Sequence, residues 1–338
     1  SIGWEKTYQW NYGVDLGFFD GRINLSFDYY DSKTKDLLFS RTLPVTSAIT
    51  AWGSPMATWQ NIGETSNKGY EIQLSTVNVK SRNFQWSSSI SYTHNDEKIV
   101  DLPDGDLIAK KLFEGHPIKT FYDFKYAGIW STAEEEEAAK YGCQPGYVKI
   151  ETVEQFTTDE NGNLVGDGGV HTYSNTRDLQ ILGSNVPDGI LGVNNTFKYR
   201  DFDLSVFAIV RYGQMIDSKT IGWYSANGNN QPRGTNYWTP ENQSAYFPRP
   251  GIASTTGIGS LKYIDGSYAK IKNITLGYTF PKKLCKTLGL EQCRLYATAY
   301  NVFVLPFKSE LKHSDPENNG SDTFPLYKTY LLGLNVSF

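Results

Sequence analysis

The sequence has no long apolar run and little histidine, methionine or cysteine. No segment approaches the ~20 consecutive apolar residues of a membrane-spanning helix, and the mean hydropathy is −0.45. The net charge of −4 leaves no basic surface for nucleic acid, so no nucleic-acid partner is expected. The four histidines are scattered, and no pair has the spacing of a metal site.

Sequence signatures of enzymes are absent as well. There is no G-x-S-x-G, no P-loop and no C-x2-C pair, and no pair of carboxylates stands out for glycosidase chemistry. We therefore expect neither an enzyme nor a cofactor. Cys285 and Cys293 flank a short turn, which is compatible with a disulfide in an oxidising compartment or with two buried thiols, and Cys143 is left over. No signal-peptide pattern precedes Ser1, so we expect a mature chain or one whose front is missing.

The chain is rich in aromatic residues and in short segments that alternate between apolar and polar side chains. Aromatics make up 14%, with 23 tyrosines, as expected where amphipathic rings lie at a water–lipid boundary. A period of two with unlike faces predicts a strand between two unlike media. The clearest example is residues 330–338, where Tyr330, Leu332, Leu334, Val336 and Phe338 lie opposite Leu331, Gly333, Asn335 and Ser337.

The polar sides of these segments are small and mostly uncharged. A soluble sandwich would place Lys and Glu on its outer face, whereas a transmembrane barrel places polar side chains on a wet lumen. The composition therefore favours a lumen. Its wall is predicted to contain Asn24, Ser26, Gln73, Ser75, Gln85, Ser89, Asn194, Thr196 and Asn335.

The predicted strands are joined alternately by short and long connections. Tight turns are expected near residues 19–21, 79–83, 200–201 and 281–292, the last with one helical turn. Long loops are expected at about 40–65, 101–188, 217–266 and 306–326. Short periplasmic turns and long extracellular loops are typical of outer-membrane barrels. The fold class predicted is therefore all-β, a transmembrane antiparallel β-barrel.

Nine strands are predicted, near 7–19, 22–38, 66–79, 84–100, 189–200, 202–216, 267–281, 293–305 and 327–338. A complete barrel starts and ends in the periplasm and leaves no open edge, which an odd number of strands does not allow. We therefore interpret residues 1–338 as the carboxy-terminal part of a larger barrel. Its first strand would pair with a missing predecessor and its last with a missing first strand.

Motifs along nearly the whole chain then resemble a known family. They include Asn67-Lys68-Gly69-Tyr70-Glu71, Tyr126-Ala127-Gly128-Ile129-Trp130, Tyr237-Trp238-Thr239-Pro240-Glu241-Asn242 and Gly333-Leu334-Asn335-Val336-Ser337-Phe338. In this order they resemble the carboxy-terminal barrel of SusC/RagA-type TonB-dependent outer-membrane transporters of Bacteroidetes. One stretch departs from the family, because Pro145 to Ile150 is not followed by the usual Asp-rich segment. A cation site in that segment is therefore not carried over to this chain.

The resemblance implies an outer-membrane location and about nine strands of a 22-stranded barrel filled by an amino-terminal plug. It also implies a SusD-like surface lipoprotein as lid, energy from the TonB–ExbB–ExbD complex acting through the missing amino-terminal part, and a possible dimer of the two-protein complex. The plug is absent from this chain. Tyr330 and Phe338 would form the assembly signal of the last strand.

Loop aromatics are the candidate contacts for substrate or lid, since flat rings beside Asn and Gln suit a glycan. They are Trp52, Trp59, Trp223, Tyr224, Tyr237 and Trp238. For each ring alone, packing against neighbouring loops is the better interpretation. Some contact by this set is nevertheless expected.

Asp159, Asn161 and Asn163 have the oxygen spacing that opens a calcium loop, but Val170 occupies the position of the bidentate Glu. An ordinary Asn-Gly turn is therefore favoured, and no metal is predicted. Residues 134–140 predict a short surface helix whose acidic face is solvated, with a cationic partner as the alternative.

The sequence thus predicts active import of a large nutrient across the outer membrane. A glycan is expected on family grounds, and an oligopeptide is the alternative substrate. A carbohydrate-binding β-sandwich is the alternative of another class, and it would place the apolar faces against a second sheet.

Overall fold

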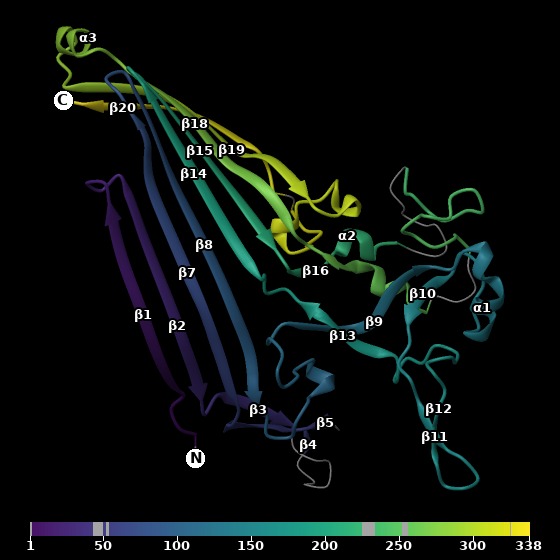
Figure 1. The fold of residues 1–338 in the computed structure, drawn as a ribbon. Coiled ribbons are helices and arrows are strands. Elements are labelled where there is room, and N and C mark those ends of the chain that lie inside the picture. The colour runs from purple at the N-terminus through teal and green to yellow at the C-terminus, as the bar shows by residue number, and fades with distance from the viewer. Residues whose placement is uncertain (1, 43–49, 52–53, 225–233, 252–255, 325) are drawn as a thin grey trace.

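The computed structural model describes residues 2–42, 50–51, 54–224, 234–251, 256–324 and 326–338. Its main element is one antiparallel sheet of nine strands in the order β1-β2-β7-β8-β14-β15-β18-β19-β20 (Figure 1). The strands are β1 (Lys6–Phe18), β2 (Ile23–Lys35), β7 (Glu64–Lys80), β8 (Phe84–Asp101), β14 (Gly189–Tyr199), β15 (Phe202–Tyr212), β18 (Tyr268–Thr279), β19 (Gln292–Pro306) and β20 (Thr329–Ser337).

All nine predicted strands are confirmed, and each pairs with its predicted neighbours. Among the described residues β1 pairs only with β2 and β20 only with β19, so the sheet is an open arc whose two outer strands each have one unpaired edge. Every residue of β1 is exposed. This is the geometry expected of part of a barrel wall.

The connections sort by length at the two ends of the sheet, as predicted. At one end lie the tight turns, where Phe19, Asp20 and Arg200 adopt positive φ. The longest of these turns holds α3 (Lys282–Thr287), which begins directly after Pro281 and confirms the predicted helical turn. The long connections lie together at the opposite end (Figure 1).

The predicted long loops contain more secondary structure than the sequence pattern indicated. The first holds β3 (Leu38–Thr42), β4 (Thr50–Ala51), β5 (Ser54–Pro55) and β6 (Ala57–Asn61). The second holds β9 (Thr120–Ile129), α1 (Glu135–Lys140), β10 (Val148–Glu151), β11 (Phe156–Thr158), β12 (Leu164–Gly166) and β13 (Leu179–Ser184). The third holds β16 (Met215–Asp217), α2 (Lys219–Gly222) and β17 (Tyr263–Asp265). Short 3-10 helices cover 108–110, 132–134, 258–262, 309–311 and 316–318.

The register brings apolar side chains into continuous rows on one face of the sheet. Directly opposed residues of an antiparallel pair share a face. One row runs through Val14, Phe27, Ile72, Tyr92, Leu191 and Val210, on six successive strands. In the described structure no second sheet is stacked on this face, because all smaller sheets belong to the long connections (Figure 1). The sandwich alternative is therefore wrong.

Two tyrosines lie across glycines, one on each face of the sheet. Tyr296 covers Gly333 and Tyr212 covers Gly189, each directly opposite its glycine in the register. A β-carbon on either glycine would overlap the ring. Such cross-strand pairs bring the ring against the bare backbone and pin the register.

The clusters of buried hydrophobic side chains lie in the connections and not in the nine-stranded sheet. The three clusters of buried side chains contain Trp130, Ala138, Cys143 and Tyr147; Ile216, Ile221, Tyr224, Leu261, Ile264 and Leu311; and Phe124, Val148 and Ile150. We call these packed connections the loop layer. All three cysteines are free thiols, with Cys143 inside the first cluster and Cys285 buried in α3. None of the described helices is long and apolar enough to cross a membrane.

Gly277 gives the first testable prediction. Arg294 reaches across it to Asp203 with Nη2–Oδ2 at 2.5 Å and Nε–Oδ1 at 2.9 Å, and an added β-carbon would overlap both groups. We expect Gly277→Ala to destabilise the folded full-length protein by about 1–2 kcal/mol, because the bidentate pair must separate. Thermal unfolding followed by gel mobility measures this.

Gly17→Ala is the matched control in the same sheet. The nearest atom to its added β-carbon, Asn24 Oδ1, lies at an ordinary 3.5 Å. Equal melting temperatures for both variants would contradict the role assigned to the ion pair.

Candidate functional site

The polar face of the sheet forms a continuous wall. The register places Asn24 opposite Ser75, Ser75 opposite Ser89, and Ser89 opposite Asn194, so the four strands contribute one row. The other predicted wall residues lie on the same face: Ser26, Gln73, Gln85, Thr196 and Asn335. The structure thus brings together every residue of the predicted wall, although its lining of a pore stays a prediction.

Charged residues on this wall are paired in two places. Arg294 holds Asp203 near the short-turn end. Near the loop end Lys270, only 2% exposed, lies 2.5 Å from Asp315 Oδ2 and 2.6 Å from Glu317 Oε2, and Lys272 also contacts Glu317. Asp315 and Glu317 belong to the last long connection. This ion cluster therefore ties that connection to the wall, and the sequence pattern contained no signal for it.

The loop layer interlocks three connections that are far apart in sequence. The Tyr126 hydroxyl donates to the carbonyl of Tyr246 at 3.1 Å, and the Lys219 amide donates to the carbonyl of Gly320 at 2.8 Å. Ile258 packs against all three hydrophobic clusters. The layer is thus a preformed body over one end of the wall.

The six candidate aromatic residues divide by burial. Trp59, Trp223 and Tyr237 are 57%, 55% and 44% exposed, so a large part of each residue lies at the surface. Tyr224 and Trp238 are buried: Tyr224 stacks on Phe247 and donates to the carbonyl of Pro248, and the indole of Trp238 packs under Gly146. These two rings are therefore part of the loop core and offer no open stacking face. Trp52 lies outside the described residues.

The Trp223 indole also helps to hold the loop layer together. Its Nε1 donates to Asp322 Oδ2 at 3.0 Å, which joins the third and fourth connections.

Asp159, Asn161 and Asn163 form the turn of the β11–β12 hairpin. Asp159 Oδ1 accepts from the amides of Asn161 at 2.9 Å and Asn163 at 2.8 Å. These bonds, chiefly those from Asn163, lower the pKa of the Asp159 carboxyl. The carboxylate is thus occupied by the turn that the sequence favoured. No cluster of three or more His, Cys, Asp or Glu suited to a metal occurs in the described part of the chain.

The predicted acidic helix is confirmed as α1. Its amino end is paired rather than only solvated, because Glu134 lies 2.7 Å from Lys149, and Ala138 packs fully buried against the layer. The Lys149 hydrogen bond is the main cause that lowers the pKa of Glu134.

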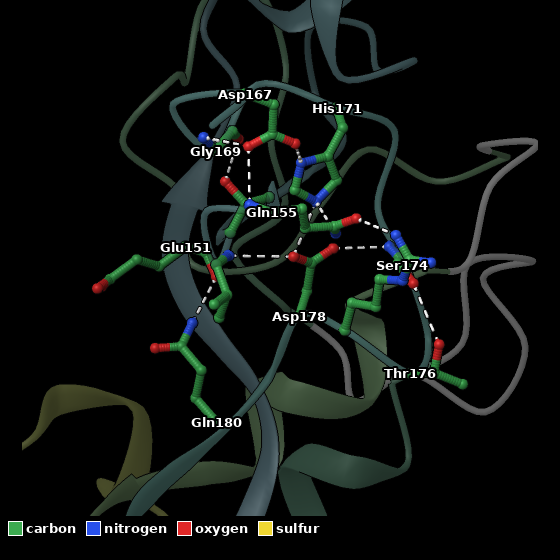
Figure 2. A network of polar contacts seen from close by, with 12 residues as sticks. Glu151, Gln155, Asp167, Gly169, His171, Ser174, Thr176, Asp178 and Gln180 are labelled. Atoms are coloured by element: carbon green, nitrogen blue, oxygen red, sulfur yellow. Dashed lines mark hydrogen bonds and ion pairs between the residues drawn. The ribbon is translucent and has the colours of Figure 1, made fainter. Parts of the chain in front are cut away.

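A buried carboxylate and a histidine fasten the base of the β11–β12 hairpin (Figure 2). His171 Nδ1 lies 2.7 Å from Asp167 Oδ2, and its Nε2 lies 3.0 Å from Asp178 Oδ1. Asp178 is fully buried and also accepts from the amides of Val153 and Ser174. His171 is one of the scattered histidines of the sequence, and only the folded loop gives it two carboxylate partners.

The comparisons with known proteins agree with this architecture. Residues 2–302 match the family described as TonB dependent receptor-like, beta-barrel. The chain belongs to this family. The resemblance inferred from the sequence motifs is thereby confirmed, and the nine-stranded sheet is part of an outer-membrane barrel of the SusC/RagA type.

Among its relatives, TonB-dependent receptor P3 of Formosa agariphila is 30% identical over the whole of this chain and 34% of its own length. TonB-dependent receptor SusC of Bacteroides thetaiotaomicron is 29% identical, over the whole chain and 32% of its own length. The chain thus spans about a third of the relatives that it matches.

Solved structures show the same fold. The RagAB peptide transporter superposes with a TM-score of 0.76 over 99% of this chain and 36% of that chain, at 22% identity. The RagAB peptide importer in its open-open state gives a TM-score of 0.74 over 100% of this chain and 35% of that one, at 20% identity.

The His171 clamp predicts a pH dependence of the hairpin. Burial opposes the charge on His171, but hydrogen bonds and charge from Asp178 and Asp167 outweigh it and raise its pKa. A histidine whose pKa is raised on folding stabilises the fold at pH values below its unfolded pKa of about 6.5. This stabilisation is lost as the pH rises through the pKa of the folded state. We expect amide exchange in residues 151–178 to accelerate between pH 6 and pH 9, beyond the intrinsic change.

In His171→Gln this excess pH dependence should vanish, whereas His116→Gln should keep it. The same excess acceleration in His171→Gln would show that another group controls the hairpin.

Proposed function

We propose that the chain is the carboxy-terminal part of a transporter that imports a large nutrient across the outer membrane. Membership of the TonB-dependent receptor family supports this proposal. The observation that carries it is the sheet with two unlike faces, which suits a wall between lipid and a wet lumen. The family is one of receptors rather than enzymes.

In this proposal the short turns are periplasmic and the loop layer is extracellular. Preformed binding surfaces lose less ordering entropy when a partner binds. A layer with its own core and ion cluster suits the capture of a ligand above the lumen.

We infer a glycan as the first candidate substrate. The exposed rings of Trp59, Trp223 and Tyr237 support it, because an open aromatic face packs well against the apolar face of a sugar ring. An oligopeptide is the second candidate, and the fold likeness to a structure described as a peptide transporter favours it. Charged groups of the loop layer would suit peptide termini.

The remaining parts of the mechanism belong to the whole protein. We propose a SusD-like surface lipoprotein as lid, because SusC and RagAB are among the similar proteins. TonB, with ExbB and ExbD, would supply energy through an amino-terminal plug, and two such complexes would form a dimer.

Uptake by cells tests this function. The full-length gene is deleted, and uptake of labelled oligosaccharides and of labelled oligopeptides is measured with and without complementation. We expect deletion to abolish uptake of one class, and inactivation of TonB to abolish it equally. Unchanged uptake of both classes after deletion would refute the transport proposal, and loss of peptide uptake alone would replace the glycan.

Two exposed rings test the substrate contact. We expect Trp59→Ala and Tyr237→Ala in the full-length protein to weaken substrate binding roughly fivefold each, since a stacked ring contributes about 1 kcal/mol. Binding to the purified receptor measures this, and the melting temperature should stay unchanged. Leu288→Ala is the control, because this residue is 64% exposed at the opposite end of the sheet. Equal binding by all three variants would remove these rings from the site.

A further inference from the structure

The lipid-facing side of the sheet contains one polar row. Thr76, Ser88 and Asn195 are directly opposed on β7, β8 and β14. The row on the loop side of it is Leu74, Ile90 and Val193, and the row on the turn side is Val79, Trp86 and Phe197. A polar row between apolar rows is costly in a bilayer unless its groups are satisfied.

The polar side chains of this row are partly satisfied by a chain of hydrogen bonds with one another and with Asn78. The Thr76 hydroxyl donates to Asn78 at 2.8 Å, Asn78 Nδ2 donates to Ser88 at 2.7 Å, and Ser88 donates to Asn195 Oδ1 at 2.6 Å. Trp86 Nε1 also donates to Asn195 Oδ1, at 2.9 Å. Asn78 reaches this face because the strand bulges between Val77 and Val79.

The groups of this row that lack a partner among the described residues are the side-chain N–H donors of Asn195. Asn195 Oδ1 accepts two bonds, while the described residues provide no acceptor for its amide N–H groups. A side-chain amide has two such donors. The partner that fits is therefore an acceptor, and within the membrane boundary those acceptors are the ester and phosphate oxygens of lipids.

A groove at the turn end of the row includes a positive charge, Arg22, which also borders a pocket on the polar wall beside Ser75 and Asn194. The groove has a volume of about 380 Å³ and is lined by Phe19, Arg22, Ile23, Thr76, Val77 and Asn78. The Arg22 guanidinium donates to the carbonyls of Val77 at 3.2 Å and Asn78 at 3.3 Å. Among the described residues Arg22 has these carbonyls as partners and no carboxylate.

We propose that this groove binds a glycerophospholipid of the inner leaflet. Arg22 holds the phosphate, whose planar oxygens suit a guanidinium. The polar row meets ester oxygens, and the acyl chains lie along the apolar rows nearer the loops. Basic pockets beside polar groups at the membrane boundary recognise lipid head groups in this way. The inference rests on the periplasmic side proposed above for the short turns and on the apolar face meeting lipid, and not on which nutrient is imported.

Lipid titration tests the site. The full-length receptor, purified in mild detergent, is titrated with dioleoylphosphatidylglycerol, and bound lipids are counted by native mass spectrometry. We expect Arg22→Gln to lose one bound lipid or to bind it roughly fivefold more weakly, and Arg22→Lys to retain most of the binding. Asn195→Leu, which leaves Arg22 in place, should also weaken binding.

Arg200→Gln is the matched control, because Arg200 occupies another tight turn at the same end and lies over Tyr199. It should bind lipid as the unmodified receptor does. Equal lipid counts in Arg22→Gln and the unmodified receptor would overturn the proposal, and so would an equal loss in Arg200→Gln. Displacement of the lipid by millimolar inorganic phosphate would overturn it in favour of free phosphate as ligand.

Discussion

The strand-to-strand hydrogen bonding of the nine-stranded sheet is the constraint on which the rest of the structure depends. In lipid no water satisfies a backbone amide or carbonyl, so each strand must pair along its length. Pairing fixes the register, and the register decides which side chains form rows on each face. The rows of Val14 and Asn24 follow from it, one apolar and one polar.

The position of the hydrophobic core follows from the same constraint. A sheet that forms a single layer has little interior in which side chains can pack. The buried residues therefore gather in the long connections, where Trp130, Ile216 and Phe124 each belong to a cluster. The loop layer is in this sense the globular part of the molecule, attached to a wall that serves as its base.

Charges connect the layer with the wall. Lys270 on β18 is almost completely buried, and a buried lysine is stable only when paired. Its partners Asp315 and Glu317 come from the last connection, so removing either side would leave an uncompensated charge. The loop layer is thereby held in a defined place over the end of the polar wall, which is where a transporter would receive its substrate.

The sequence by itself was enough to predict the nine-stranded sheet. Nine strands, their order, the two faces and the two kinds of connection could all be predicted, because a period of two and a turn between neighbours are local properties. It did not predict β9 to β13, the burial of Tyr224 and Trp238, the His171 clamp or the polar row at Asn195. Those features depend on contacts between residues far apart in sequence, and only the tertiary structure decides which of them meet.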